Sequence, residues 1–372
     1  MSKIKLAIIL GLLLLLGFMI PIAETSGGDG DHIAGKNYKF FDQKGKLVTM
    51  TSRQPFTGDE IITAGGLHYR VASVQENTAR VKLVGKEKEY LALVKYYDSL
   101  ETVPAAAGEW AKRPVAVYHT HTDESYLPTD GASSIPFKGG IFQVGATFGD
   151  ALTDERVKVL YNRTSHDPHD ANAYYRSRRT AVQLLKENPV AIFDVHRDGV
   201  DDPEFYRRIV SDKNVTQMRL VVGRQNPKME TNLDFAKRLL AFGNKQHPEL
   251  LKEIYIARGN YNQDLLSTAL LIEAGTYTNE KWQAENGITL LANSVPALLG
   301  LDPPAEGITG KEAGRQGWKT ALFLIMLLVL ALIGFIVLNI PGLNAKEYLQ
   351  KQYEKYLPVV EQYIAEIRKK VR

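Results

Sequence analysis

Three short stretches of the sequence combine histidine and acidic residues in a way that suits metal chemistry. The first is His119-Thr-His121-Thr-Asp-Glu124, the second is His196-Arg-Asp, and the third is Glu273-Ala-Gly. Imidazole and carboxylate are the ligands that Zn²⁺ takes when thiolate is absent, and this chain has no cysteine. The absence of cysteine also excludes a cysteine nucleophile. We therefore expect a metal site built from nitrogen and oxygen ligands.

The spacing of His121 and Glu124 allows one tight turn to bring both side chains to a single ion. A second histidine from a separate strand, His196, would complete a site of three protein ligands with one position left for water. His119 should point away from Tyr118 along its strand. It is therefore an alternative ligand in place of His121, or a residue that supports the ligands from behind. We predict one Zn²⁺ at this site.

Hydrolysis of an amide also needs a group that takes a proton from water and passes it to the leaving nitrogen. Glu273 is the natural candidate, because the apolar residues before it would place it in a partly dry cleft. Arg197 and Arg178 are expected to orient the carboxylates of an anionic substrate.

Alternating strand and helix patterns, starting at Arg113, are expected to position these residues. Buried strands are predicted at residues 115–118, 157–160, 190–195, 220–222, 254–257 and 269–272, and helices at 142–152, 174–186, 232–245 and 287–299. This order is typical of a mainly parallel sheet with helices on both faces. Ligands of such sheets bind beyond the carboxyl ends of the strands, where the first two histidine stretches and Glu273 are predicted to lie.

Residues 38–97 show a different pattern of short strands separated by Gly and Asn turns. We predict a small all-β module before the α/β domain. The predicted fold class is therefore α/β, with a mainly parallel sheet, a preceding β module and two flanking transmembrane helices.

Two long apolar runs, residues 6–23 and 321–338, are each long enough to cross a bilayer core of about 30 Å as a helix. The first run could instead be a cleaved signal peptide. Basic residues beside both runs predict cytoplasmic termini and an extracytoplasmic catalytic domain at the cytoplasmic membrane. The predicted parts are an anchor and linker (1–35), the β module (36–103), the catalytic domain (104–305), a linker and second span (306–340), and a cytoplasmic amphipathic helix (341–372).

The sequence allows three roles for one further loop. The loop containing His166 and His169 could line a substrate groove, form another metal site or be a solvated polar loop.

The net charge of +4 is modest and spread out, without a basic stripe that contains aromatic residues, so we expect no nucleic acid partner.

Four blocks of sequence, in order, resemble the stage II sporulation protein P family. They are Val117-Tyr-His-Thr-His-Thr-Asp-Glu-Ser-Tyr, Tyr175-Arg-Ser-Arg-Arg-Thr, Asp194-Val-His-Arg-Asp-Gly and Leu271-Ile-Glu-Ala-Gly. The resemblance covers residues 114–301 and the N-terminal anchor. The second apolar run and the helix after it depart from the usual architecture of that family.

The resemblance implies a zinc-dependent N-acetylmuramoyl-L-alanine amidase whose fold is similar to that of zinc carboxypeptidases. It implies His121, Glu124 and His196 as zinc ligands and Glu273 as the catalytic glutamate. Peptidoglycan would be the substrate, with a lytic transglycosylase and a membrane scaffold protein as partners during engulfment. The alternatives are an endopeptidase that cleaves only cross-links and a non-catalytic scaffold that binds the wall.

Overall fold

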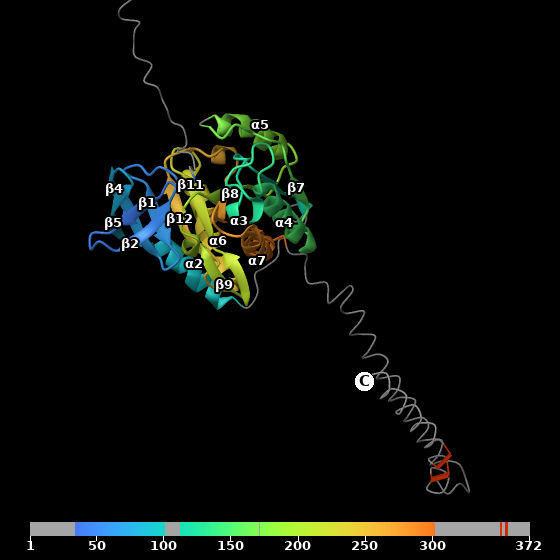
Figure 1. Cartoon of the computed structure of the whole chain (residues 1–372). Coiled ribbons are helices and arrows are strands. Elements are labelled where there is room, and N and C mark those ends of the chain that lie inside the picture. The colour runs from blue at the N-terminus through green and yellow to red at the C-terminus, as the bar shows by residue number, and fades with distance from the viewer. Residues whose placement is uncertain (1–33, 101–111, 171, 302–349, 352–353, 356–372) are drawn as a thin grey trace, which may run out of the picture. The chain divides into compact units, whose positions relative to one another are not determined.

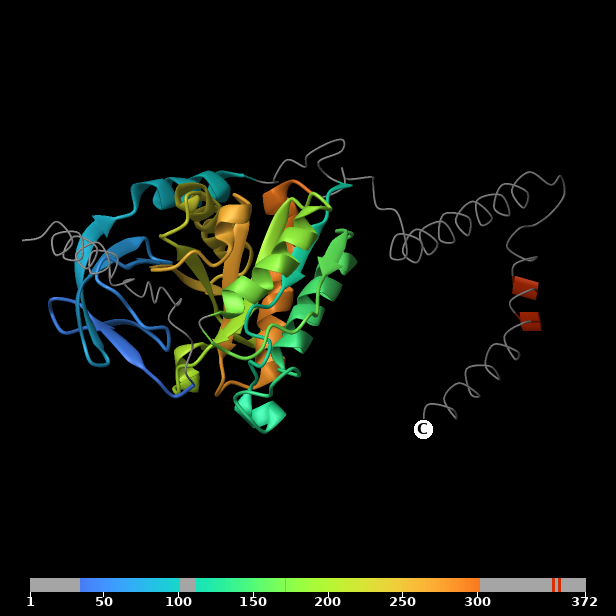
Figure 2. The ribbon, with the colours of Figure 1, turned by 90° about the horizontal axis from the view of Figure 1, so that it is seen from above.

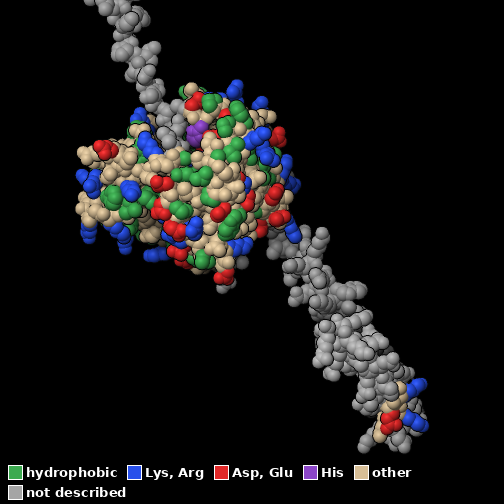
Figure 3. All heavy atoms as spheres, in the orientation of Figure 1, with side chains coloured by type: hydrophobic (Ala, Val, Ile, Leu, Met, Phe, Trp, Pro, Cys, Tyr) green, Lys and Arg blue, Asp and Glu red, His purple; other side chains and the backbone are tan. Residues whose placement is uncertain are grey.

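The structure is a computed structural model that describes residues 34–100, 112–170, 172–301, 350–351 and 354–355 (Figure 1). The chain divides into two compact units, Met1–Pro304 and Ala305–Arg372. All the described strands belong to the first unit. On the face drawn in Figure 3, basic and acidic side chains are interspersed.

An eleven-stranded sheet forms the centre of the first unit. In spatial order its strands are β2 (Leu47–Thr51), β1 (Tyr38–Phe41), β5 (Thr78–Lys86), β4 (Leu67–Gln75), β3 (Glu60–Thr63), β12 (Leu251–Ala257), β11 (Met218–Gly223), β13 (Ala269–Thr276), β8 (Ala191–Asp198), β6 (Val115–Tyr118) and β7 (Val159–Tyr161). A separate two-stranded hairpin joins β9 (Arg207–Val210) and β10 (Lys213–Thr216).

The prediction of a mainly parallel sheet is wrong, because the sheet is mixed. Strands β7, β6, β8 and β13 run parallel, but β11 is antiparallel to β13, and β12 is antiparallel to β3. The strands expected to form a separate β module instead extend this sheet, since Ile62 of β3 pairs with Ile254 of β12. Ile61 and Ile62 point to opposite faces and are both fully buried, so β3 behaves as an interior strand.

Helices cover both faces of the sheet, unevenly (Figure 2). On one face α2 (Lys88–Ser99) packs on α6 (Met229–Gln246), α6 on α7 (Lys281–Leu299), and α7 on α4 (Ile141–Asp154). On the other face α5 (Ala173–Leu185) contacts β6, where Ala181 and Leu184 join a smaller apolar cluster. Helix α2 was not predicted, although Tyr90 and Tyr97, two turns apart, give it a buried side.

The predicted strands and helices of residues 113–301 are otherwise confirmed within a few residues at most of their ends. Two strands continue further than predicted: β8 ends at Asp198 and β13 at Thr276. His196 and Glu273 therefore lie inside fully buried strands and not beyond their ends. A residue inside a buried strand is enclosed more tightly than one beyond its end, so both side chains lie in closer surroundings than predicted.

The prediction of two transmembrane helices and a membrane location is also corrected. Among the described residues, no helix is long and apolar enough to cross a membrane. The longest described helices, α6 and α7, carry charged and polar side chains along their length. The two apolar runs, the proposed domain boundary at 103–108 and the C-terminal amphipathic pattern lie wholly or almost wholly outside the described residues.

Candidate metal centre and active site

The loop that follows β6 carries His121 and Glu124, and it is held on two sides by one side-chain and one backbone hydrogen bond. Tyr126 donates a hydrogen bond to the Ala274 carbonyl of β13 at 2.8 Å. The Ile141 amide, at the start of α4, donates to the Glu124 carbonyl at 3.0 Å. Gly139 lies so close that a Cβ there would meet the Thr122 and Glu124 carbonyl oxygens at 2.5 Å. The loop conformation therefore depends on a glycine at position 139.

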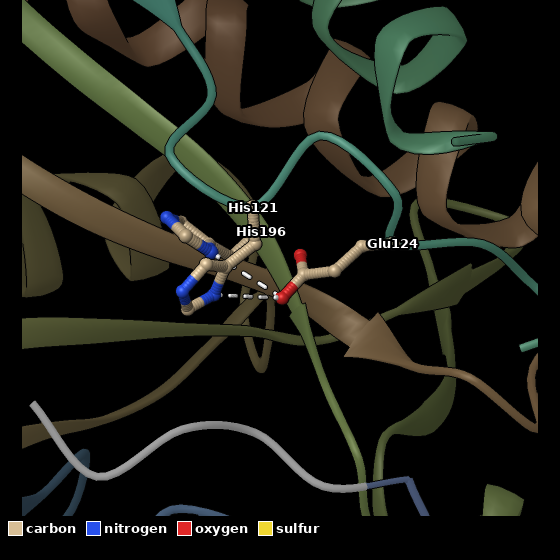
Figure 4. Close-up of side chains that lie close together, drawn as sticks. All are labelled: His121, Glu124 and His196. Carbon is tan, nitrogen blue, oxygen red and sulfur yellow. Dashed lines mark hydrogen bonds and ion pairs between the residues drawn. The ribbon is translucent and has the colours of Figure 1, made fainter. Parts of the chain in front are cut away.

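His121, Glu124 and His196 meet in one fully buried cluster (Figure 4). Glu124 Oε1 lies 3.4 Å from Nδ1 of His121 and 3.4 Å from Nδ1 of His196. All three ligand atoms lie within 4.8 Å of one another. Two ligand atoms about 2.1 Å from a tetrahedral ion are themselves about 3.4 Å apart. The residues present therefore fit a metal ion with two imidazole ligands and one carboxylate ligand.

Asp194 fixes the orientation of His196. Its Oδ1 lies 2.9 Å from His196 Nε2, and it also accepts hydrogen bonds from the Thr120 amide at 2.8 Å and the Thr120 hydroxyl at 2.5 Å. With Nε2 engaged in this way, Nδ1 of His196 faces Glu124. A carboxylate behind a histidine ligand holds the ring in place and increases its basicity.

The electrostatics of the cluster favour a positive charge. Burial alone would lower the pKa of His196, but the carboxylates of Asp194 and Glu124 outweigh this and raise it to about 10. Burial alone would raise the pKa of Glu124, but the charges of His196 and Arg197 hold it well below its usual value. Two ionised carboxylates in a dry site attract a cation, which a proton on His196 or a metal ion can supply.

His119 lies apart from this cluster. Its Nδ1 is 2.6 Å from the Val195 carbonyl oxygen and its Nε2 is 3.0 Å from the Tyr161 hydroxyl. Burial lowers the pKa of His119 to about 4, so the ring is neutral. Gly145 of α4 allows this packing, since a Cβ there would lie 2.2 Å from His119 Nε2. In this arrangement both ring nitrogens contact neighbouring strands, Nδ1 reaching β8 and Nε2 reaching β7.

Glu273 lies beside His196, because the two residues pair in register on the parallel strands β13 and β8. Its side chain is fully buried and contacts two guanidinium groups: Arg219 Nη1 at 3.1 Å and Arg53 Nη2 at 3.8 Å. The sequence predicted a partly dry cleft for Glu273, whereas the structure surrounds its carboxylate with buried charges.

Sequence reasoning missed the residues that surround Glu273. Arg219 also pairs with Asp198 and, at 2.8 Å, with Glu253. Arg53 follows β2 and stacks on the Tyr261 ring at 4.7 Å, while Ser52 donates to Asp198 from its amide at 2.9 Å and its hydroxyl at 2.8 Å. The N-terminal strands therefore build one wall of the site. The sequence did contain one signal for these partners. Arg219 is a charged residue in an otherwise apolar strand, and a buried charge needs a partner.

The two arginines predicted to bind substrate make contacts within the protein. The buried Arg197 donates to the carbonyl oxygens of Ser125 at 3.2 Å and Ser133 at 2.8 Å, and its amide donates to Glu124 Oε2 at 2.9 Å. Arg178 pairs with both carboxylate oxygens of Asp264 at 2.8 and 2.6 Å. Arg197 thus holds the loop that carries His121 and Glu124, and Arg178 joins α5 to the loop before β13.

The loop with His166 and His169 lies against the cluster. His166 is buried, with its ring nitrogens 2.6 Å from the His119 carbonyl oxygen and 2.8 Å from the Thr180 hydroxyl. His169 stacks on His121 with 3.8 Å between ring centroids and 23° between planes. Its Nδ1 lies 2.9 Å from Asp123 Oδ1. Burial alone would raise the pKa of Asp123, but the contacts with His169 and Ser134 hold it below its usual value.

Comparison with known proteins places the chain in a family. A curated relative, the Stage II sporulation protein P of Bacillus subtilis (strain 168), is 29% identical over 201 residues, which cover 49% of this chain and 50% of the relative. The chain thus matches about half the length of that relative. A solved N-acetylmuramyl-L-alanine amidase of Mycobacterium smegmatis aligns with a TM-score of 0.34 and 13% identity, over 52% of this chain and 99% of that chain. The sequence model described as Stage II sporulation protein P matches residues 50–295, so the chain belongs to that family.

Proposed function

We propose that this protein is a zinc-dependent peptidoglycan hydrolase that cleaves the amide between N-acetylmuramic acid and L-alanine during spore formation. The observation that carries the proposal is the buried cluster of His121, Glu124 and His196, with Glu273 on the adjacent strand. Membership of the stage II sporulation protein P family supports both the reaction class and the setting. The name of the curated relative agrees with this setting.

The chain's own residues would each have a defined task. His121, Glu124 and His196 would hold the ion, with Asp194 keeping the His196 ring in place. When bound, zinc supplies a positive charge that polarises a carbonyl group and makes water more acidic. Glu273 would accept a proton from the attacking water and deliver it to the leaving nitrogen. Arg219 and Arg53 would hold the Glu273 carboxylate in place.

The reaction is a hydrolysis that balances without a co-reactant. The water oxygen forms a bond to the carbonyl carbon of the lactyl group, and the carbon–nitrogen bond breaks. The nitrogen leaves as the amino group of L-alanine with the proton carried by Glu273. The products are a glycan with free lactyl carboxylates and a stem peptide with a free amino terminus.

The test uses the full-length chain loaded with zinc and incubated with intact sacculi. We expect about one zinc per chain and release of stem peptides with an L-alanine amino terminus, detected by mass spectrometry. Glu273→Gln should keep the zinc and lose activity by about 10²-fold to 10⁴-fold. A parent chain that binds zinc but leaves sacculi intact would rule out the hydrolase.

The same digestion separates the amidase from its rivals. An amidase leaves glycans without peptide, whereas an endopeptidase for cross-links leaves monomeric muropeptides. A scaffold would bind sacculi without either product. The predicted association with a lytic transglycosylase and a scaffold protein stays a proposal that a pull-down from sporulating cells would test.

A further inference from the structure

His169 lies at the site and has no task in the proposed mechanism. It belongs to the loop before α5 and lies face to face with His121, one of the three cluster residues. His169 is outside the group whose ligand atoms all lie within 4.8 Å of one another. Its ring therefore borders the metal centre without being part of the ligand set.

Asp123 determines which nitrogen of His169 carries the proton. Asp123 is buried and its Oδ1 lies 2.9 Å from His169 Nδ1, while Ser134 donates to its other oxygen. A carboxylate can only accept, so Nδ1 of His169 is the donor. In the neutral ring Nε2 is then left as an acceptor that points away from Asp123.

That Nε2 atom has no hydrogen-bond partner among the described residues, although it is buried. The side chain as a whole retains 16% of its exposure, so it lies at the border between the buried cluster and the surface. Buried polar atoms in proteins are nearly always paired, because an unpaired one costs free energy. An acceptor held in this way is suited to a donor that arrives with the substrate.

We propose that His169 is a substrate-binding residue whose Nε2 accepts a hydrogen bond from the first peptide N–H beyond the amide to be cleaved. The inference rests on the proposed function, since it assumes a muramyl peptide at the metal centre. The His169 and His121 rings are 3.8 Å apart, and one residue of extended peptide spans about 3.5 Å. A peptide that is cleaved at the cluster and runs toward His169 would bring its next N–H to the level of that ring.

The stacking contact suggests a competing role, which the choice of variants separates. His169→Phe keeps an aromatic ring against His121 but removes both nitrogens. His169→Gln removes the ring but can return an acceptor oxygen to the region of Nε2. His247→Phe is the control, because His247 follows α6 and contacts Ser211 Oγ at 3.0 Å, with no contact to the cluster.

All variants are made in full-length chains that also carry Glu273→Gln. The experiment measures their zinc content and their affinity for muramyl dipeptide. This probe contains the amide to be cleaved and one following peptide N–H. We expect His169→Phe to keep its zinc and to bind about fivefold to tenfold more weakly, the effect of one hydrogen bond. His169→Gln should recover part of the affinity, and His247→Phe should bind like the parent.

A second probe carries a methyl group on that peptide nitrogen. The parent should bind it about fivefold to tenfold more weakly than muramyl dipeptide, whereas His169→Phe should bind both probes equally. Unchanged binding by His169→Phe would leave only a stacking role, and loss of zinc would make His169 a ligand, so either result overturns the inference. If the chain with Glu273 intact digests sacculi, either result still supports the hydrolase. If that chain does not digest sacculi and the Glu273→Gln chain does not bind the probe, the proposed function itself is refuted.

Discussion

The metal cluster and the surroundings of Glu273 lie on neighbouring strands, yet they balance buried charge in opposite ways. In the cluster, the carboxylates of Glu124 and Asp194 lie against histidine rings, and the guanidinium of Arg197 lies 4.0 Å from Glu124, so a second positive charge must come from a proton or an ion. Around Glu273, the guanidinium groups of Arg219 and Arg53 are built into the protein. The first region therefore relies on a bound cation for part of its balance, whereas the second carries its main cations in its own side chains.

This difference separates the two tasks of the proposed site. A region with one fixed guanidinium for two carboxylates can take up a metal ion with a gain in electrostatic energy. A carboxylate between fixed guanidinium groups stays in one position, which suits a group that must transfer a proton along a defined path. Mutations in the first region should therefore act through metal affinity, and mutations in the second through stability and rate.

The largest expected effect is the loss of metal from the cluster. His196→Ala removes one of the three proposed ligands and leaves Glu124 and Asp194 without their shared partner. We expect no zinc to be retained after dialysis, and activity on sacculi to fall by at least about 10³-fold. Metal analysis beside the activity assay tests this. A variant that keeps one zinc per chain would show that the ion lies elsewhere.

Substituting Arg219 in the surroundings of Glu273 should lower the stability of the folded protein. Arg219→Met leaves Asp198, Glu253 and Glu273 buried without their main cation, which costs about 3–5 kcal/mol in the free energy of unfolding. For a domain of this size the melting temperature should drop by roughly 10 °C. Calorimetry of the zinc-free chains measures the change without a contribution from the ion.

The double variant Arg219→Met, Glu273→Gln sharpens this test. Removing one of the unpaired charges should restore part of the lost stability, so the two changes should not be additive. Additive losses would mean that Arg219 and Glu273 do not interact in the folded protein.

The two regions also differed in how far the sequence could predict them. The spacing of His121 and Glu124, and a histidine at the end of an apolar strand pattern, are local signals, and the structure places these three residues together. The partners of Glu273 come from β2 and β11, whose neighbours in the sheet depend on long-range pairing. Local periodicity predicts that a strand exists but not its direction or position in the sheet. For this reason most strands of the central sheet were predicted, whereas their arrangement in the sheet was not.

A smaller effect on metal affinity is expected at Asp194, which contacts the His196 ring. Asp194→Asn keeps the shape of the side chain but removes the charge that holds the His196 ring. Mutating such supporting residues weakens metal binding by about tenfold to a hundredfold. Zinc titration against a competing chelator measures this shift. If Asp194→Asn binds zinc as tightly as the parent, the orientation of His196 is set by packing alone.

The smallest effect is expected at Arg178, where the sequence predicted substrate binding and the structure shows a pair with Asp264. Both side chains are partly exposed, at 39% and 21%, so the ion pair is screened by water. Arg178→Gln should change the free energy of unfolding by less than about 1 kcal/mol. It should also leave KM for soluble muropeptides within about twofold of the parent, because Asp264 already occupies both arms of the guanidinium. A clear rise in KM without a change in melting temperature would instead mean that Arg178 exchanges Asp264 for a carboxylate of the substrate.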